Sequence, residues 1–155
     1  MKMLDATDLR IVEILLKDSR ISLKELAASV GLSSPGASER LKRLEERGVI
    51  RGFTVDVDPR ALGYVLQAIV RIKPLPGMLG TVQKLLEDTP EIGECDKVTG
   101  DDCFVARLHV RSMEHLDHIL DRIADKAQTN TALVKAQPIR RRLPGLGLAE
   151  RASRG

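Results

Sequence analysis

Aromatic residues are almost absent from this sequence of 155 residues, which contains no Trp, one Tyr and two Phe. A folded core must therefore consist of aliphatic side chains, and a hydrophobic content of 43 % is sufficient to form one. Cysteine is scarce as well, since Cys95 and Cys103 lie eight positions apart and belong to no CxxC pair. This spacing disfavours a disulfide scaffold and a structural zinc site, so both cysteines are expected to be small buried hydrophobic residues.

Long apolar segments are also missing. The longest run without a charged residue, residues 26–38, contains Ser, Gly and Pro and is too short to cross a bilayer. The N-terminal residues MKMLDATDLR lack the apolar stretch of a secretory signal. The sequence thus predicts a cytoplasmic protein without a membrane partner.

An excess of one charge sign is absent from most of the chain. The net charge is +1 over residues 1–60 and −2 over residues 61–137, and only residues 138–155 are clearly basic, at +4. Charge alone is therefore a weak indication of a polyanionic partner. Segment 138–155 has no hydrophobic period and is expected to be a flexible basic tail. Its Arg140–Arg142 run either adds non-specific phosphate contacts or only aids solubility.

The N-terminal part has the hydrophobic period of short helices. The broad apolar stripe of a first helix, which starts near Asp5, contains Leu9, Val12 and Leu16, flanked by Ile11 and Leu15. The run Ser22-Leu-Lys-Glu25 is a capping box that opens a second helix. Gly31 can end that helix because glycine adopts the left-handed conformation that a helix C-terminus needs.

A third helix is predicted from Ser34 to Arg47. Ser33 or Ser34 can cap its start, Pro35 fits its first turn, and Gly48 ends it. Its inward-facing residues are predicted to be Ala37, Leu41 and Leu44. A helix, a short turn and a second, capped helix are typical of a helix-turn-helix.

The hydrophobic period changes from that of a helix to that of a strand at Phe53. Residues 53–57 alternate between apolar and polar, and Pro59 closes this predicted strand. The remaining segments predict the order strand, helix, strand, strand, helix, strand, at residues 66–73, 77–88, 92–99, 103–111, 113–126 and 129–136. This βαββαβ order indicates an α+β fold, a ferredoxin-like domain with both helices on one face of an antiparallel sheet.

These patterns divide the chain into a (winged) helix-turn-helix domain at 1–52, a linker strand at 53–62, a ferredoxin-like domain at 63–137 and the tail at 138–155. The uncovered face of the sheet is predicted to carry polar and apolar residues together: Gln67, Ile69, Arg71, Val105, Arg107 and His109. Such a face is either solvated or packed on a second copy of the chain, and its aliphatic residues favour the second copy.

The third helix is the candidate DNA-binding element. In a helix-turn-helix the second helix of the motif lies in the major groove, with its N-terminal residues near base edges. Ser34 can approach a phosphate, Ser38 and Glu39 are placed to contact bases, and the basic residues can bind phosphate or guanine. The predicted contact set is Ser34, Pro35, Ser38, Glu39, Arg40, Lys42, Arg43 and Arg47. Related helical modules also bind proteins, and the spacing alone leaves that alternative open.

The segment Val98-Thr-Gly-Asp-Asp102 joins two predicted strands and is the candidate ligand loop. Gly100 permits a tight turn and the close approach of a ligand. The carboxylates of Asp101 and Asp102 can accept hydrogen bonds from an ammonium group, while a turn N–H can meet a carboxylate. The loop could therefore hold an amino acid, although a plain hairpin turn accounts for the same residues.

No pattern of catalytic residues accompanies this loop. The sequence has no Ser/His/Asp or Cys/His set, no phosphate-binding loop and no spaced acid pair, so an enzyme is not predicted. His115 and His118 have the spacing of a metal pair on a helix, but without a third ligand nearby in sequence they are expected to be surface residues. No metal and no cofactor are predicted.

Several motifs occur in a fixed order along the chain. In the first half these are Leu4-Asp5, Asp8, Ile11-Val12, Leu15, Asp18 to Ser22, Glu25 to Ala27, Val30 to Ser33, Arg40 to Glu45 and Gly48 to Ile50. In the second half they are Pro90 to Ile92 and Val98 to Phe104. Over about residues 4 to 137, this order resembles the Lrp/AsnC (leucine-responsive/asparagine) family of transcription regulators.

The resemblance implies a regulator that binds double-stranded DNA and responds to a small molecule, an amino acid, through a ferredoxin-like domain. It further implies self-association, as a dimer or as a tetramer or octamer, and a place in the cytoplasm on the nucleoid. An architectural DNA-binding protein without an effector is the alternative. A small enzyme or metal carrier with a ferredoxin-like fold is a third hypothesis.

The resemblance also implies an effector pocket formed by the loop and the subunit packed against it. The residues carried over are Val98, Thr99, Gly100, Asp101, Asp102, Cys103 and, on the last strand, Thr131. The family often has a second acidic residue where Cys103 stands, which leaves the identity of the effector open. Thr131 could equally be an ordinary strand residue.

Overall fold

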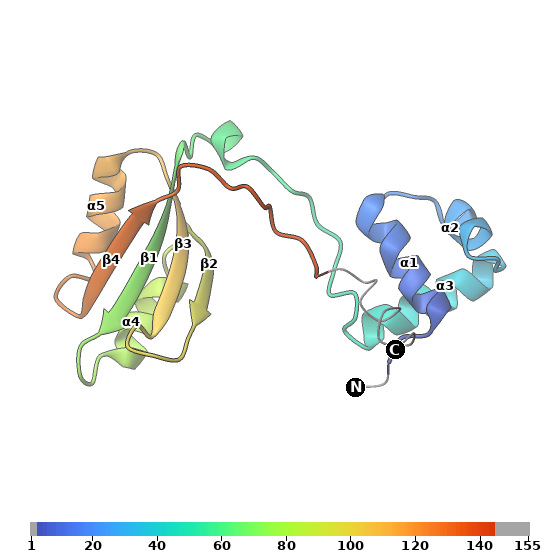
Figure 1. The fold of residues 1–155 in the computed structure, drawn as a ribbon, viewed down its shortest axis with the longest axis horizontal. Coiled ribbons are helices and arrows are strands. Elements are labelled where there is room, and N and C mark those ends of the chain that lie inside the picture. The colour runs from blue at the N-terminus through green and yellow to red at the C-terminus, as the bar shows by residue number, and fades with distance from the viewer. Residues whose placement is uncertain (1–2, 145–155) are drawn as a thin grey trace, which may run out of the picture. The chain divides into compact units, whose positions relative to one another are not determined.

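The computed structural model describes residues 3–144, whose contacts form two compact units (Figure 1). The first unit contains three helices, α1 (Ala6–Lys17), α2 (Leu23–Ser29) and α3 (Ser34–Glu46). The second unit, Asp56–Arg140, contains a four-stranded sheet, two α-helices and a short 3-10 helix, Pro59–Leu62. The predicted (winged) helix-turn-helix and ferredoxin-like α+β architecture is confirmed.

Local hydrogen bonds explain where the helices of the first unit begin and end. The capping box is present, because Ser22 Oγ accepts from the Glu25 N–H and Glu25 Oε2 accepts from the Ser22 N–H. Gly31 has a φ of 67°. The N–H groups of Gly31 and Leu32 donate to the carbonyls of Ala28 and Ala27, which is the Schellman arrangement. A short turn therefore separates α2 from α3, as the sequence predicted.

The core of the first unit is small and aliphatic. Ile11, Leu26 and Leu44 are almost completely buried, one from each helix. The predicted stripe of α1 is wrong in one position, because Leu16 is 56 % exposed. The buried face of α1 is centred on Ile11, and Leu16 lies outside it.

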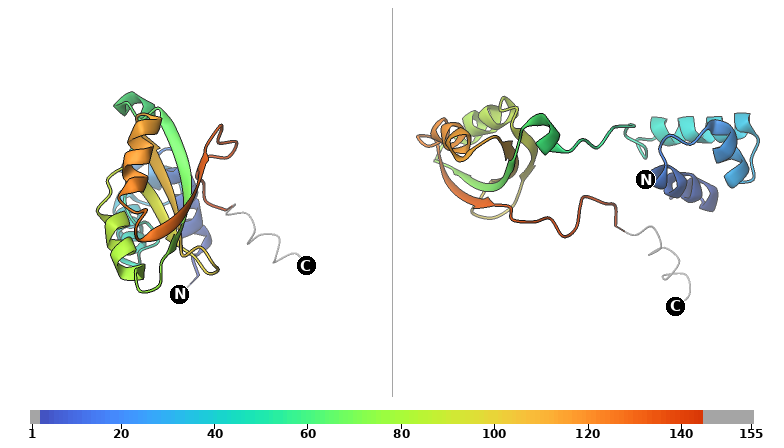
Figure 2. Two further views of the ribbon diagram at one scale, coloured as in Figure 1. Left: turned by 90° about the vertical axis from the view of Figure 1, so that its left-hand side faces the viewer. Right: turned by 90° about the horizontal axis from the view of Figure 1, so that it is seen from above.

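The second unit follows the βαββαβ order. Its elements are β1 (Leu66–Pro74), α4 (Leu79–Glu87), β2 (Ile92–Lys97), β3 (Phe104–Val110), α5 (Met113–Asp121) and β4 (Ala127–Leu133). The strands pair antiparallel in the order β2-β3-β1-β4. Figure 2 shows α4 and α5 on one face of this sheet. The core lies between the helices and that face and includes Val70, Ile72, Val82, Phe104, Leu108 and Leu116.

Several predicted boundaries shift for identifiable reasons. Helix α4 starts at Leu79 and not at residue 77, because Gly77 has a φ of 79°, which a right-handed helix does not contain. Helix α5 ends at Asp121, and turns fill residues 122–126. Strand β4 starts earlier than predicted, at Ala127, because that residue pairs with Pro74 at the end of β1.

The predicted linker strand at 53–57 is wrong for the single chain. Residues 51–58 have no regular secondary structure, and they pair with no other described strand. The apolar side chains remain exposed, with Phe53 at 52 %, Val55 at 80 % and Val57 at 48 %. A strand forms only when its backbone groups find a partner, and within residues 3–144 these do not.

The C-terminal part contributes no further helix or strand between residues 134 and 144. Residues 145–155 of the predicted tail lie outside the described residues. Among the helices that the structure describes, none has the length and apolar character needed to span a membrane.

Candidate nucleic-acid interface and effector loop

The outward face of α3 is polar and open. Ser38, Glu39, Lys42 and Arg43 are exposed. The Lys42 ammonium lies 3.6 Å from Glu46 Oε1, and Arg43 Nη2 lies 4.0 Å from Glu39 Oε1. Such exposed pairs one helical turn apart are weak, so both cations can exchange a carboxylate for another anion.

The start of α3 is favourable for an anion. Ser33, and not Ser34, is the N-cap, since its Oγ accepts a hydrogen bond from the Gly36 N–H at 3.3 Å. Pro35 stands in the first turn, which holds no acidic residue. Free N–H groups and the helix dipole therefore meet solvent without a competing carboxylate.

Two predicted contact residues are engaged with α1. Arg40 Nη1 donates to Asp5 Oδ2 at 2.6 Å and to Asp8 Oδ1 at 2.8 Å, and its side chain is only 26 % exposed. Arg47 Nη1 lies 3.8 Å from Asp8 Oδ2. The Arg40 guanidinium lowers the pKa of Asp5. The structure thus separates Arg40 from the open set on α3.

The candidate effector loop lies at the end of the β2–β3 hairpin. The Val98 N–H donates to the Cys103 carbonyl at 2.9 Å, which closes the loop, and Gly100 has a φ of 111°. Asp101 is exposed, whereas Asp102 Oδ2 lies 3.7 Å from Arg71 Nη1 of β1. The loop therefore presents the exposed carboxylate of Asp101 and the carboxylate of Asp102, which faces a guanidinium, next to backbone groups.

Arg71 was predicted for the open sheet face but not for the effector loop. The register of β1 against β3 places Arg71 opposite Val105, close to the start of β3. Thr131 is not brought to the loop within one chain. It pairs with Val70, and β1 separates its strand from β3. The pairing of β1 with β3 brings Arg71 beside the loop, and the spacing of residues in the sequence does not reveal this pairing.

The uncovered sheet face carries the predicted mixture of residues. Gln67, Ile69 and Arg71 pair with His109, Arg107 and Val105. Arg107 Nε also lies 3.8 Å from Glu94 Oε2 on β2. Helices α4 and α5 both pack on the opposite face (Figure 2), and the six residues of this face are partly buried or exposed.

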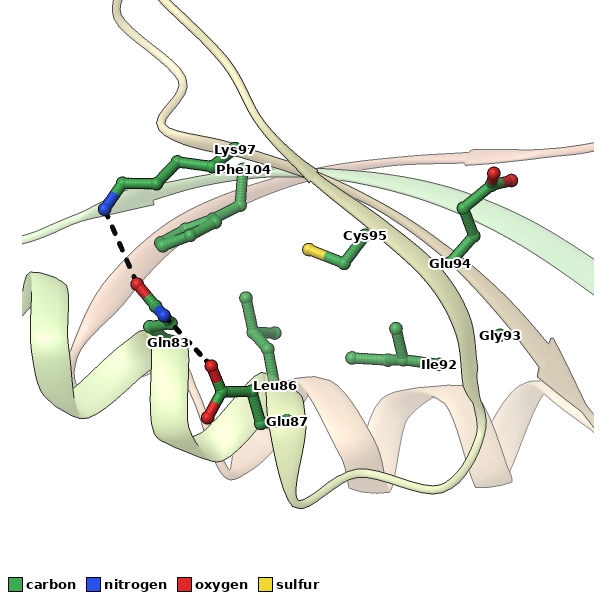
Figure 3. Close-up of a pocket in the computed structure, with 9 residues that line it drawn as sticks. All are labelled: Gln83, Leu86, Glu87, Ile92, Gly93, Glu94, Cys95, Lys97 and Phe104. Atoms are coloured by element: carbon green, nitrogen blue, oxygen red, sulfur yellow. Dashed lines mark hydrogen bonds between the residues drawn. The ribbon is translucent and has the colours of Figure 1, made fainter. Parts of the chain in front are cut away.

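A separate cavity of about 320 Å³ lies between α4 and β2 (Figure 3). Leu86, Ile92 and Phe104 form its apolar wall, and the Cys95 thiol points into it. Cys95 is exposed, so its predicted burial is wrong, and Cys103 is only partly buried. Desolvation of the thiol beside the cavity and the negative charge of Asp96 raise the pKa of Cys95. A raised pKa disfavours the reactive thiolate.

The histidine pair of α5 is divided by its surroundings. His115 Nε2 lies 3.1 Å from Glu91 Oε1, and His118 is exposed. Within residues 3–144, no group of three or more His, Cys, Asp or Glu is arranged to hold a metal ion.

Two family models match this chain, one for each unit. Residues 4–51 match the winged helix-turn-helix DNA-binding model, and residues 67–144 match the Lrp/AsnC ligand-binding domain. Together with the open face of α3 and the ferredoxin-like unit, these matches define the class: a DNA-binding transcriptional regulator with a separate ligand-binding domain.

Individual relatives agree with that class. The HTH-type transcriptional regulator FL11 of Pyrococcus furiosus is 40 % identical over 120 residues, which cover 77 % of this chain and 80 % of that protein. The solved structure of Bacillus subtilis LrpC, 29 % identical, has a TM-score of 0.84 and covers 90 % of this chain and 100 % of its own. The chain belongs to the Lrp/AsnC family of transcriptional regulators.

Two of the solved relatives are complexes with L-methionine. The feast or famine regulatory protein of Mycobacterium tuberculosis, complexed with L-methionine, is 32 % identical to this chain. Its TM-score is 0.84, and the match covers 92 % of this chain and 99 % of the other.

Proposed function

We propose that this regulator binds operator DNA by inserting α3 into the major groove. The observation that carries the proposal is the exposed polar face of a helix that follows a short turn. On that face Ser38 and Glu39 contact bases, while Lys42 and Arg43 exchange their intrahelical partners for phosphates. Ser34 and Pro35 stand in the first turn of α3, which meets the DNA backbone. Arg47 lies at the other end of this helix. A DNA target places this action on the nucleoid, in the cytoplasm.

The salt dependence of DNA binding tests this assignment. Arg43→Gln should lower the slope of log affinity against log salt by about one phosphate contact. Lys84→Gln is the matched control, because Lys84 also pairs with a carboxylate one turn away, Asp88 at 3.5 Å, but lies on α4. The probe is a duplex that the wild-type protein selects from a random library. Equal slopes for the two variants would remove Arg43 from the interface.

The ligand is an amino acid bound at the 98–103 loop. The loop offers the exposed Asp101 carboxylate to an ammonium group, and Arg71 beside Asp102 supplies a cation for a carboxylate. A relative in complex with L-methionine supports this class of effector. Thr131 belongs to the pocket only if a second subunit brings it there, since β1 separates it from the loop of its own chain.

A thermal-shift panel of the standard amino acids tests the pocket. A ligand that binds only the folded protein raises its melting temperature. Asp101→Ala should abolish that increase, while Asp117→Ala, an exposed carboxylate on α5, should preserve it. A shift that persists in Asp101→Ala would place the site elsewhere. No shift with any amino acid would favour the effector-independent architectural protein.

Self-association completes the proposal. The exposed, unpaired segment 53–57 and the uncovered sheet face each offer apolar surface to a second copy. A dimer presents two copies of α3 to a palindromic site, which gives specificity that one helix lacks.

A further inference from the structure

Arg40 lies in the middle of α3, yet its guanidinium is held by α1. One nitrogen, Nη1, donates to carboxylates from two residues, Asp5 at 2.6 Å and Asp8 at 2.8 Å. Both distances are those of charge-assisted hydrogen bonds. Asp5 is also the N-cap of α1, where its Oδ1 accepts from the Asp8 N–H at 2.7 Å. The start of α1 is thereby tied to the centre of α3.

The position of this network favours a mechanical role. Asp8 is 8 % exposed and is one of two buried polar or charged residues in the described part of the chain. A carboxylate at that depth is stable only when it is paired, and Arg40 supplies its shortest ion pair. Arg47 also lies 3.8 Å from Asp8, and aliphatic side chains such as Ile11 and Leu44 fill the core between the helices. The hydrophobic effect is non-directional, whereas hydrogen bonds require a defined distance and angle, so the two hydrogen bonds of Arg40 add a directional constraint between α1 and α3.

We propose that Arg40 is a positioning residue that, with Asp5 and Asp8, fixes the rotation of α3 about its axis. The inference rests on the proposed insertion of α3 into DNA. Ser38 and Glu39 immediately precede Arg40 on the helix, so the rotation that Arg40 fixes decides which way they face. Arg40 acts on base recognition through them and contacts no phosphate.

A direct contact and a positioning role predict opposite signs for the acidic partners. If Arg40 bound DNA, removing Asp8 or Asp5 would release the guanidinium and remove a negative charge, so binding would tighten. If Arg40 positions α3, the same changes weaken recognition. Asp5→Asn is the sharper variant, because Asn caps a helix as well as Asp and only the charge is lost.

The experiment compares the wild type with Asp5→Asn, Asp8→Asn, Arg40→Gln and Arg40→Lys. Two probes are used, a duplex selected by the wild type from a random library and a scrambled duplex of the same composition. We expect all four variants to lose about tenfold in affinity for the selected duplex, the value of one base contact. Affinity for the scrambled duplex and the salt slope should stay at the wild-type values. Arg40→Lys keeps the charge, but its ammonium stands on a shorter side chain than Nη1 of arginine and should not reach both carboxylates, so it should not restore binding.

Controls separate this role from unfolding and from failure of the proposed function. Binding is measured at a temperature at which circular dichroism shows intact helices, and Asp5→Asn retains the cap that folding of α1 requires. Unchanged or tighter binding by Asp5→Asn and Asp8→Asn would overturn the inference, as would a salt slope lowered by Arg40→Gln. A wild-type protein that selects no duplex would overturn the proposed function and this inference together, whereas the previous outcomes leave DNA binding by α3 intact.

Discussion

Ser22 and Glu25 satisfy each other's hydrogen bonds at the start of α2. Ser22→Ala should lower the free energy of unfolding of the first unit by about 1 kcal/mol at neutral pH, the usual cost of losing an N-cap. Hydrogen bonds from Ser22 lower the pKa of Glu25 below its ordinary 4.5. The stabilisation from the hydrogen bonds between Ser22 and the ionised Glu25 is therefore present above pH 4.5. It is lost as the pH falls through the pKa of Glu25 in the folded protein.

We thus expect the difference in stability between wild type and Ser22→Ala to shrink in acid. Urea unfolding followed by circular dichroism, at neutral pH and below pH 4.5, measures it. Ser29→Ala is the matched control, because Ser29 Oγ donates only to the Glu25 carbonyl in the same helix. A gap that is constant across this pH range would contradict the link to Glu25.

Single residues were predictable where neighbours in sequence determine them. The box at Ser22 and the left-handed Gly31 depend on a few adjacent positions, and both were predicted correctly. The partner of Arg40 was not predictable, because it lies 32 to 35 positions away on α1. The exposure of Cys95 was also missed, since β2 is an edge strand of the sheet and its residues after Ile92 are exposed.

At the scale of whole elements, the effect of burial can be tested by comparing a buried leucine of α3 with an exposed leucine of α1. Leu44→Ala on α3 removes a side chain that is 1 % exposed and should cost about 2–5 kcal/mol. Leu16→Ala on α1 removes one that is 56 % exposed, so its effect should stay within about 0.5 kcal/mol. Thermal unfolding of the two variants checks this. Equal losses would contradict the burial pattern centred on Ile11.

The element order and the covered sheet face followed from periodicity, because β3 alternates strictly between buried and half-buried positions. The 53–57 segment has the same alternation, yet no strand forms. Periodicity describes which side of a strand is apolar, but pairing requires a second strand, and the described chain supplies none there. The end of α5 was missed because its apolar stripe continues to Ile123, beyond the last helical residue.

At the scale of the whole molecule, the unpaired segment 53–57 predicts how copies assemble. Val55→Lys places a charge on the apolar side of this segment and should lower the mass of the assembly in solution. Thr54→Lys is the control, because the adjacent position faces the other side of an extended chain. Light scattering after size exclusion, with and without each standard amino acid, measures both assembly and its response. A mass that Val55→Lys leaves unchanged would exclude this segment from the interface.

Arg71 lies on strand β1 among the residues of the uncovered sheet face, and its guanidinium is 3.7 Å from the Asp102 carboxylate in the loop. Under the proposed function, this one side chain belongs both to the surface that meets another subunit and to the effector pocket. If the effector shifts the equilibrium toward one quaternary arrangement, that arrangement must bind the effector more tightly by the same factor. Under the proposed function, the concentration of the effector and the population of each oligomer therefore report the same equilibrium.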